Sequence, residues 1–385
     1  MTYEPPRRLR GITKSAIRDF FDRAPAGSIN LGLGEPDLPT PEIVREAAVR
    51  AIQAERNGYT AHAGLPALRE RIASGYPGLD PAVERVIVTA GSQEALYLAL
   101  LSLVDEGDEV LLPNPGFIAY PAIVAMAGGR AVFYRLPGAG DFGFDGDEFR
   151  RQVTPRTKVV VCISPSNPTG RMLGTEDLEA MAAALAGTNA VVVSDEIYRE
   201  LYFDAARPPS MANHYANTVT VSGLSKSMSM TGWRLGWLTG PAEVVRSALV
   251  LHGYVTTCAS TISQKAALAA WSEQAEQARA AVRAIFRDRR DHLRRAIEHT
   301  LGLRAVMPDG AFYTMLDTAG YGNSRQVAET LLEHGVITVP GGTFGTEGEG
   351  FLRLSFCVDK PALSEGVRRM GEALAALRTN EALRA

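Results

Sequence analysis

Apolar and polar positions along the chain repeat first at helical and then at strand spacing. Residues 41–55 (PEIVREAAVRAIQAE) carry apolar side chains on one helical face, and Thr40 in front of them is a candidate N-cap. Residues 92–107 repeat the pattern, with Leu96 and Leu100 on a shared apolar face. The pattern therefore predicts two amphipathic helices early in the chain.

Short runs rich in valine, isoleucine and leucine stand between the helical stretches and predict β-strands. They cover residues 85–90, 108–115, 131–136, 157–170 (where the strand runs into a proline-rich turn), 190–198 and 217–226. Strands separated by helices indicate an α/β fold with a mostly parallel sheet and helices on both faces. In such sheets ligands bind beyond the carboxyl ends of the strands, so the residues that follow each strand are the first candidates for a site.

The pattern changes in the last third of the chain. A long arginine-rich helical stretch, residues 273–300, leads into two β-rich stretches at 303–317 and 351–359. This order is typical of a smaller α+β domain. We expect a large domain over 46–285 and a small domain over 286–385, with residues 1–45 packing against the small domain.

Composition narrows the function classes. The chain has 385 residues, 46% of them hydrophobic, and a formal net charge of −3, which does not favour nucleic acid or an anionic membrane as a partner. No apolar run approaches the roughly twenty residues of a membrane helix, and no secretory signal is visible, so a cytoplasmic protein is expected. The three cysteines and six histidines lack metal-site spacing, and no metal is predicted.

Small residues separate the strand at 85–90 from the helix that follows. Gly91, Ser92 and Gln93 would expose backbone N–H groups at the helix N-terminus, which favours an anion such as phosphate. An ordinary strand–helix turn capped by Ser92 is the other reading, and for this stretch alone it is the more common one.

Three further strand ends carry polar or aromatic side chains. Asn167 lies between two prolines in a rigid turn, and Asp195 ends an apolar strand with Tyr198 three residues later. A carboxylate in Asp195's position is costly to bury unless it meets a cation. Phe117 follows a strand and a stiff turn, where it could stack on a flat ligand or belong to the core. A turn residue for Asn167 and a helix cap for Asp195 are the structural alternatives.

Two cations stand in the mostly apolar stretch SGLSKSMSMTGWRLGW, residues 222–237. Lys226 follows a strand, as a nucleophilic or Schiff-base lysine would, and Arg234 has the planar donor group that suits phosphate. Together with Asp195 they form the set that pyridoxal phosphate requires. The glycines at Gly32 and Gly34 lack the third glycine of a dinucleotide-binding fingerprint.

Residues 223–236, GLSKSMSMTGWRLG, resemble the lysine signature of the class I/II aminotransferases, which are fold-type-I pyridoxal phosphate-dependent enzymes. Other stretches resemble the family in the same order along nearly the whole chain, among them INLGLGEPDLPTP, VTAGSQEAL, PNPGFIAYP, SPSNPTG, SDEIYRELYFD, PDGAFY, PGGTFG and FLRLSF. The resemblance implies a large domain with a mostly parallel seven-stranded sheet flanked by helices, and a smaller α+β domain.

The resemblance also implies roles for the residues at the strand ends. Lys226 would hold the cofactor as a Schiff base and later shuttle the substrate's proton, and Asp195 would pair with the pyridine nitrogen. Tyr198 and Asn167 would hydrogen-bond the ring oxygen, and Phe117 would stack on the ring. The residues expected at the cofactor phosphate are Gly91, Ser92, Gln93, Ser225 and Arg234.

Substrate and partner residues follow from the same resemblance. Arg353 would bind the substrate α-carboxylate, helped by Asn167 and the backbone at Gly34. Tyr59 would reach the phosphate of a neighbouring subunit, which implies a homodimer. The implied partners are otherwise small molecules, an amino acid and a 2-oxo acid.

Two positions depart from the family pattern. Gly223 stands where many members have serine, so Ser222 or Ser225 would have to supply one phosphate contact. Gln93 stands where some members that favour dicarboxylic substrates carry lysine, so the resemblance does not predict aspartate specificity.

The function that the sequence favours is transfer of the amino group of an L-amino acid to a 2-oxo acid by a ping-pong mechanism. A pyridoxal phosphate-dependent carbon–sulfur β-lyase is the alternative, because the same cofactor residues serve both reactions. A non-catalytic regulator that senses the cofactor or an amino acid is a more remote alternative. The donor, the acceptor and the pathway stay open.

Overall fold

The computed structural model describes residues 4, 6, 9–12, 14, 16–54, 56–76, 85–204 and 206–382. Its largest element is a seven-stranded sheet with the strand order β2-β8-β7-β6-β5-β3-β4. Only β8 runs antiparallel to its neighbours, which confirms the predicted α/β fold with a mostly parallel sheet. The strands are β2 (Val86–Thr89), β3 (Glu109–Asn114), β4 (Arg130–Arg135), β5 (Thr157–Ile163), β6 (Val191–Asp195), β7 (Thr218–Gly223) and β8 (Gly236–Thr239).

Strand β8 is the one member of this sheet that the sequence pattern did not predict. It has four residues, begins with a glycine and follows the Lys226 segment directly. It pairs with β7 on one side and with β2 on the other, so the chain turns back on itself after Lys226. Such a short strand shows no alternation of its own, and its place is set by these two neighbours.

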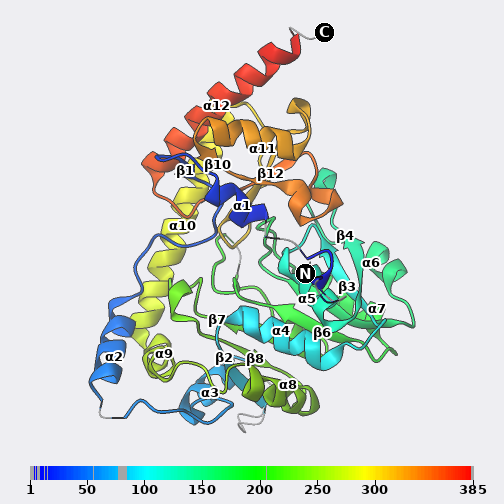
Figure 1. Cartoon of the computed structure of the whole chain (residues 1–385), viewed down its shortest axis with the longest axis vertical. Coiled ribbons are helices and arrows are strands. Elements are labelled where there is room, and N and C mark those ends of the chain that lie inside the picture. The colour runs from blue at the N-terminus through cyan, green and yellow to red at the C-terminus, as the bar shows by residue number, and fades with distance from the viewer. Residues whose placement is uncertain are drawn as a thin grey trace.

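Helices cover both faces of the sheet (Figure 1). Val159 and Val161 of β5 pack in the cluster that contains α4 (Ser92–Leu103), α5 (Ala119–Ala127) and α8 (Ala242–Val255). Val160 and Cys162 pack in the cluster of α6 (Gly146–Gln152) and α7 (Thr175–Leu185). Alternate side chains of one strand therefore enter two different cores, which explains the continuous apolar run of β5.

A third cluster joins α2 (Glu42–Gln53), α3 (Pro66–Ala73) and α9 (Thr261–Ala267) to the segment that carries Lys226. The expectation that Thr40 caps α2 is wrong, because the N-cap is Pro41 and makes no side-chain cap bond. The Thr40 hydroxyl donates instead to the carbonyl of Ser229 at 2.8 Å. It therefore ties the start of α2 to the Lys226 segment.

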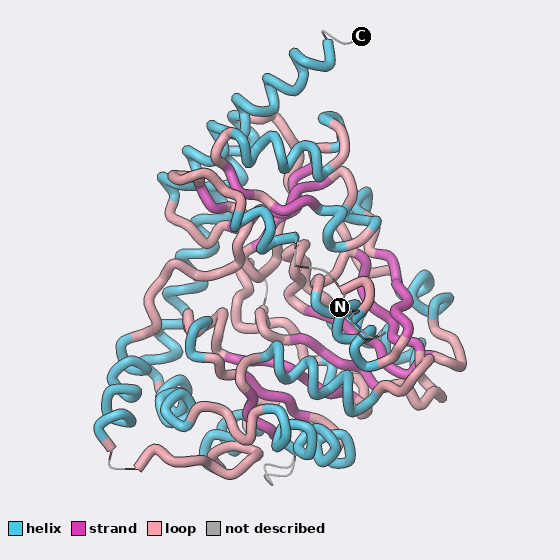
Figure 2. The backbone as a smooth tube through the Cα atoms, in the orientation of Figure 1, coloured by secondary structure: helices cyan, strands magenta, loops and turns pink. Residues whose placement is uncertain are grey.

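The C-terminal part forms a separate group of strands and helices (Figure 2). Its three-stranded antiparallel sheet has the order β11-β12-β9, and β1 pairs in parallel with β10, which brings the N-terminal part of the chain to this group. No helix of the described residues is long and apolar enough to cross a membrane. The elements are α1 (Ala16–Asp22), β1 (Ile29–Asn30), α10 (Glu273–Thr300), β9 (Tyr313–Asp317), α11 (Ser324–Glu333), β10 (Val336–Ile337), β11 (Val339–Pro340), β12 (Phe351–Ser355) and α12 (Lys360–Ala382).

Candidate active site

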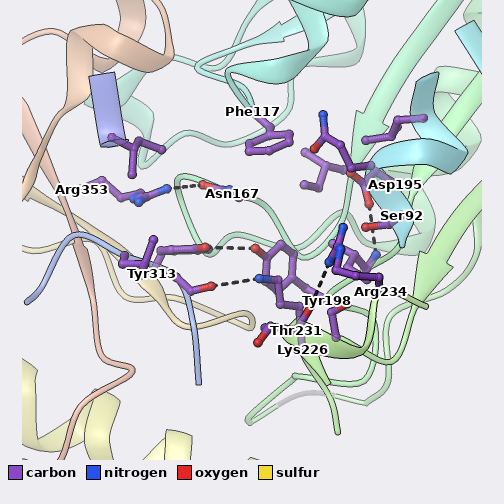
Figure 3. A pocket seen from close by; sticks show the side chains of 18 residues that line it. Ser92, Phe117, Asn167, Asp195, Tyr198, Lys226, Thr231, Arg234, Tyr313 and Arg353 are labelled. Carbon is purple, nitrogen blue, oxygen red and sulfur yellow. Dashed lines mark hydrogen bonds between the residues drawn. The ribbon is translucent and has the colours of Figure 1, made fainter. Parts of the chain in front are cut away.

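A cavity of about 250 Å³ lies at the carboxyl ends of β5, β6 and β7, where side chains from distant parts of the chain meet (Figure 3). The segment between β1 and α2 and strand β12 complete its wall. Most of the residues predicted from the sequence line it, namely Gly34, Ser92, Gln93, Phe117, Asn167, Asp195, Tyr198, Ser225, Lys226, Arg234 and Arg353. Gly91 lies beside Arg234 at the same end of the cavity, whereas Tyr59 does not line it.

Lys226 enters the cavity from the turn after β7. Its Nζ atom donates a hydrogen bond to the carbonyl of Gly34 at 2.9 Å and makes no salt bridge with a described residue. Burial lowers the pKa of the Lys226 amine, and the nearby charges of Arg234 and Arg353 lower it further. A lysine whose amine gives up its proton readily is suited to attack a carbonyl carbon.

Asp195 is the last residue of β6, and its carboxylate is buried. Tyr120 donates its hydroxyl proton to Oδ2 at 2.9 Å, and the backbone N–H of Ile197 donates to Oδ1 at 3.2 Å. Burial nevertheless raises the pKa of Asp195 from 3.8 to about 6. The described residues supply no salt bridge, so this carboxylate is suited to a cationic ligand atom such as a protonated pyridine nitrogen.

The N-terminus of α4 and Arg234 form one end of the cavity. Gly91 is the N-cap with φ +88° and has no side chain to cap the helix, so the first N–H groups of α4 have no cap side chain as a partner and are suited to a ligand. Arg234 donates from Nη1 to the carbonyl of Thr231 at 2.9 Å. A Cβ atom on Gly91 would lie 2.6 Å from Arg234 Nη2, so glycine is required for this approach. The arrangement suits a phosphate group.

The glycine that departs from the family pattern has a structural reason. A Cβ atom on Gly223 would lie 2.9 Å from the carbonyl of Leu235 and 3.1 Å from Gly236 Cα, so the pairing of β7 with β8 excludes a larger residue. Ser222 does not take its place, because its hydroxyl donates to the carbonyl of Glu196 at 3.1 Å, away from the cavity. Of the two predicted substitutes, only Ser225 lines the cavity.

Arg353 is fully buried, with 1% of its surface exposed. Its guanidinium donates to Asn167 Oδ1 at 2.8 Å and to the carbonyl of Gly32, and it lies between the rings of Tyr313 and Phe344. Its Nε atom has no partner, and the described residues contribute no carboxylate to it. A buried cation without a counter-ion is costly, so this site is suited to an incoming carboxylate.

The sequence did not identify Tyr313 and Tyr120 as residues of the site. The Tyr198 and Tyr313 hydroxyls lie 3.0 Å apart, and Tyr313 lines the cavity (Figure 3). Tyr120, the partner of Asp195, lies one helical turn after Phe117. Tyr313 stands in the motif PDGAFY and Tyr120 in PNPGFIAYP, so both were within the recognised motifs, but only the fold shows what they touch.

The cavity matches the reactive groups of pyridoxal phosphate one by one. Lys226 suits the aldehyde carbon, Asp195 the pyridine nitrogen, Tyr198 the ring oxygen, and the α4 N-terminus with Arg234 the phosphate. Phe117 lines the same cavity and could stack on a flat ring. The fold and the site together define a pyridoxal phosphate-dependent enzyme.

Comparison with known proteins identifies the family. The model of the family "Aminotransferase class I and II" matches residues 26–370, and the chain belongs to this family. It is 40% identical to the aspartate/prephenate aminotransferase of Thermus thermophilus over 90% of this chain and 91% of that protein. It is 33% identical to aromatic-amino-acid aminotransferase 2 of Thermococcus litoralis, over 95% and 97% of the two chains.

A solved structure agrees with this assignment. The aspartate aminotransferase of Thermus thermophilus with maleate superimposes with a TM-score of 0.91, at 35% identity, over 97% of this chain and all of that one. The protein is therefore a pyridoxal phosphate-dependent aminotransferase, as the sequence predicted.

The raised pKa of Asp195 predicts how the stability of the cofactor-free protein depends on pH. The folded state keeps this proton up to about pH 6, whereas the unfolded chain loses it near 3.8, so the Asp195 contribution to stability is lost as pH rises between these values. Asp195→Asn should therefore raise the unfolding free energy at pH 7 by on the order of 2–3 kcal/mol, and hardly at all at pH 4. Urea unfolding at both pH values measures this difference. An equal effect at pH 4 and pH 7 would contradict the assignment.

Proposed function

We propose that this aminotransferase holds its cofactor through the residues that converge in the cavity, with Lys226 as the covalent attachment. The observation that carries the proposal is the placement of Lys226, Asp195 and Arg353 around one cavity with no salt bridge to any described residue. When bound, pyridoxal phosphate withdraws electrons from the substrate α-carbon and lets its bonds break. Asp195 keeps the pyridine nitrogen protonated, which sustains that withdrawal.

Lys226 also moves the proton. When an amino acid takes the place of Lys226 on the cofactor, the amine of Lys226 would be free to act as a base inside the cavity. Burial lowers the pKa of this amine, which favours its unprotonated form. The same nitrogen would also return the proton, so Lys226 would serve both halves of the transfer.

Arg353 orients the substrate. A carboxylate that accepts a hydrogen bond from Nε would satisfy this unpartnered atom and neutralise the buried charge. Asn167 already accepts a bond from this guanidinium and holds it in place. The amino and oxo acids share the α-carboxylate, so both bind here in turn, and the kinetics are ping-pong.

The Lys226→Ala variant tests the attachment. It should bind pyridoxal phosphate without the absorbance band of the lysine-bound cofactor, and turnover should fall by at least about a thousandfold, because both the attachment and the base are lost. Absorbance spectra and a coupled assay of amino transfer measure both effects. Lys158→Ala, a change at an exposed lysine of β5 that does not line the cavity, is the control and should be near normal.

Two outcomes would count against this account. Near-normal turnover of Lys226→Ala would contradict the role of the lysine. Release of pyruvate and ammonia from cystathionine by the unmodified enzyme, with no oxo acid required, would favour the β-lyase alternative.

The amino donor has an uncharged side chain in this proposal. Apart from Asp195, Lys226, Arg234 and Arg353, the side chains that line the cavity are uncharged. Its aliphatic and phenylalanine members are Ile17, Leu33, Leu96, Phe117, Ile163 and Ile197. Gln93 offers a neutral amide at the position where some relatives carry lysine. In the adjoining larger cavity, Lys14 pairs with Asp22 at 2.7 Å and Arg10 with Glu4 at 3.1 Å, whereas Arg18 lies exposed at its wall.

A donor panel tests this specificity. With single donors, phenylalanine, tyrosine or leucine should convert the bound cofactor faster than aspartate or glutamate, because the described residues that line the active-site cavity offer a second carboxylate no cation beyond Lys226, Arg234 and Arg353. Gln93→Lys should raise kcat/KM for aspartate roughly tenfold by supplying that cation. The surface change Gln152→Lys should leave it unaltered. Stopped-flow absorbance follows the conversion, and a wild-type preference for aspartate would contradict the proposal.

The active unit in this proposal is a homodimer. Tyr59 is 88% exposed and Tyr254 is 92% exposed, and Val250 and Val255 of α8 are exposed nearby. His62 lies beside Gly253 and joins the Tyr59 loop to α8. Large apolar side chains in one exposed group are typical of an interface. A second copy seated on this surface would cover them and bring Tyr59 to the partner's phosphate.

Mixed dimers test whether Tyr59 acts across the interface. Tyr59→Ala and Lys226→Ala subunits should each be impaired alone, but a co-expressed mixture should regain activity, because one site then has Lys226 from one chain and Tyr59 from the other. A mixture of Asp195→Asn and Lys226→Ala subunits is the control and should regain none. Activity per heterodimer, isolated by two affinity tags, measures the effect. No gain over the control would contradict the arrangement.

The domain boundaries and the location stay predictions. We retain 1–45, 46–285 and 286–385 as the three segments, supported by the pairing of β1 with β10, which joins the first segment to the last. A cytoplasmic location is retained on the sequence alone.

A further inference from the structure

Tyr313 places a second phenol next to the cofactor site. It is the first residue of β9, it is buried, and its hydroxyl lies 3.0 Å from that of Tyr198. Among the described residues this is the one hydrogen-bond partner of the Tyr198 hydroxyl. Figure 3 shows the two side chains approaching each other across the cavity.

The position of Tyr313 is fixed on three sides. Its ring packs against Arg353, with 4.4 Å from the guanidinium carbon to the ring centre, and against Phe312 at 4.9 Å. The strap, residues 31–41 between β1 and α2, lies directly over the Tyr313 hydroxyl. A Cβ atom on Gly34 in this strap would be only 1.7 Å from the Tyr313 hydroxyl oxygen. This packing leaves the hydroxyl little freedom to turn away from Tyr198.

The hydrogen-bond inventory decides the direction of the Tyr198–Tyr313 bond. A phenol has one proton to donate, and burial raises the pKa of both tyrosines, so both keep their protons at neutral pH. If Tyr198 gives its proton to the ring oxygen of the cofactor, it can only accept from Tyr313. The chain of donors then runs from Tyr313 to Tyr198 to the ring oxygen, and each bond strengthens the next.

We propose that Tyr313 is a positioning residue that donates to the Tyr198 hydroxyl and so directs the Tyr198 proton to the ring oxygen of the cofactor. The inference rests on the proposed function, in which Tyr198 contacts that oxygen. Because the same ring backs Arg353, Tyr313 also joins the group that receives the substrate carboxylate to the group that polarises the cofactor. Tyr313 touches the reacting atoms only through Tyr198.

The absorbance of the bound cofactor reports on this chain of donors. This absorbance changes with pH because the bound cofactor loses the proton next to its ring oxygen. The negative charge of that oxygen is then no longer balanced by the proton. A donor to the oxygen stabilises the deprotonated form and lowers the pKa of the chromophore. Tyr313→Phe should therefore raise this pKa by about half a unit. Tyr198→Phe should raise it further, because Tyr198 is the direct donor to the ring oxygen and Tyr313 only strengthens that bond.

The test is a spectrophotometric pH titration of each holoenzyme without substrate. Tyr134→Phe is the matched control, because Tyr134 is as buried as Tyr313 and donates one hydrogen bond, to the Val161 carbonyl at 3.1 Å, outside the site. It should lose comparable stability and leave the chromophore pKa unchanged. Replacing Tyr313 by 3-fluorotyrosine, a stronger donor of similar size, should lower that pKa and needs no deletion of the hydroxyl.

The outcomes separate the inference from the proposed function. A shift for Tyr198→Phe but none for either change at Tyr313 would overturn the inference and leave the role of Tyr198 intact. No shift for Tyr198→Phe would overturn both the inference and the proposed contact of Tyr198 with the ring oxygen. Opposite shifts for phenylalanine and fluorotyrosine at 313 would support the donor chain, since a purely structural role predicts no such sign change.

Discussion

The site depends on the burial of three ionisable side chains without salt bridges to the described residues. Asp195, Lys226 and Arg353 lie around one cavity, and desolvation raises the pKa of the first and lowers the pKa of the other two. Burying such groups is costly unless a ligand supplies the missing charge or bond. A cofactor with a protonated ring nitrogen and an aldehyde carbon, and a substrate with a carboxylate, supply all three.

Packing around the site offsets the free-energy cost of burying these three groups. Strands β5 and β6 carry apolar side chains into two cores, so the strand ends that hold Asn167 and Asp195 are rigid. The strap between β1 and α2 crosses the cavity, where Gly34 accepts a bond from Lys226. It is anchored by a two-bond ion pair between Asp37 and Arg289 of α10, at 2.7 and 3.0 Å. The strap therefore joins the large sheet to the C-terminal group.

Much of the fold and the site could be predicted from the sequence because both leave local signals. Buried parallel strands are continuous apolar runs, and the polar residues that end them, such as Asp195 and Lys226, fall at one edge of the sheet by topology alone. Strand β8 has no such signal. Its four residues are all buried between β2 and β7, so they show no alternation of apolar and polar side chains. Thr40 was read as a cap from local chemistry, but a carbonyl distant in sequence, at Ser229, takes its hydroxyl.

The side chains that contact other side chains were the hardest to assign. Nothing near Tyr313 in the sequence shows that its hydroxyl meets Tyr198. Tyr198 lies in the turn after β6 and Tyr313 begins β9, so the two meet only in the folded chain. Ser222 and Ser225 looked equivalent beside Gly223, and only the pairing of β7 with β8 turns Ser222 away from the cavity. The sequence could identify the residues of the site by type and order, whereas their mutual contacts required the fold.

The central claim is that the cofactor is bound covalently to Lys226. Reduction of the holoenzyme with borohydride fixes the cofactor to its lysine, and digestion followed by mass spectrometry locates the modified residue. The account predicts one modified peptide, with the added mass on Lys226. Modification of another lysine, such as the exposed Lys158, or no modification of a protein that shows turnover, would contradict it.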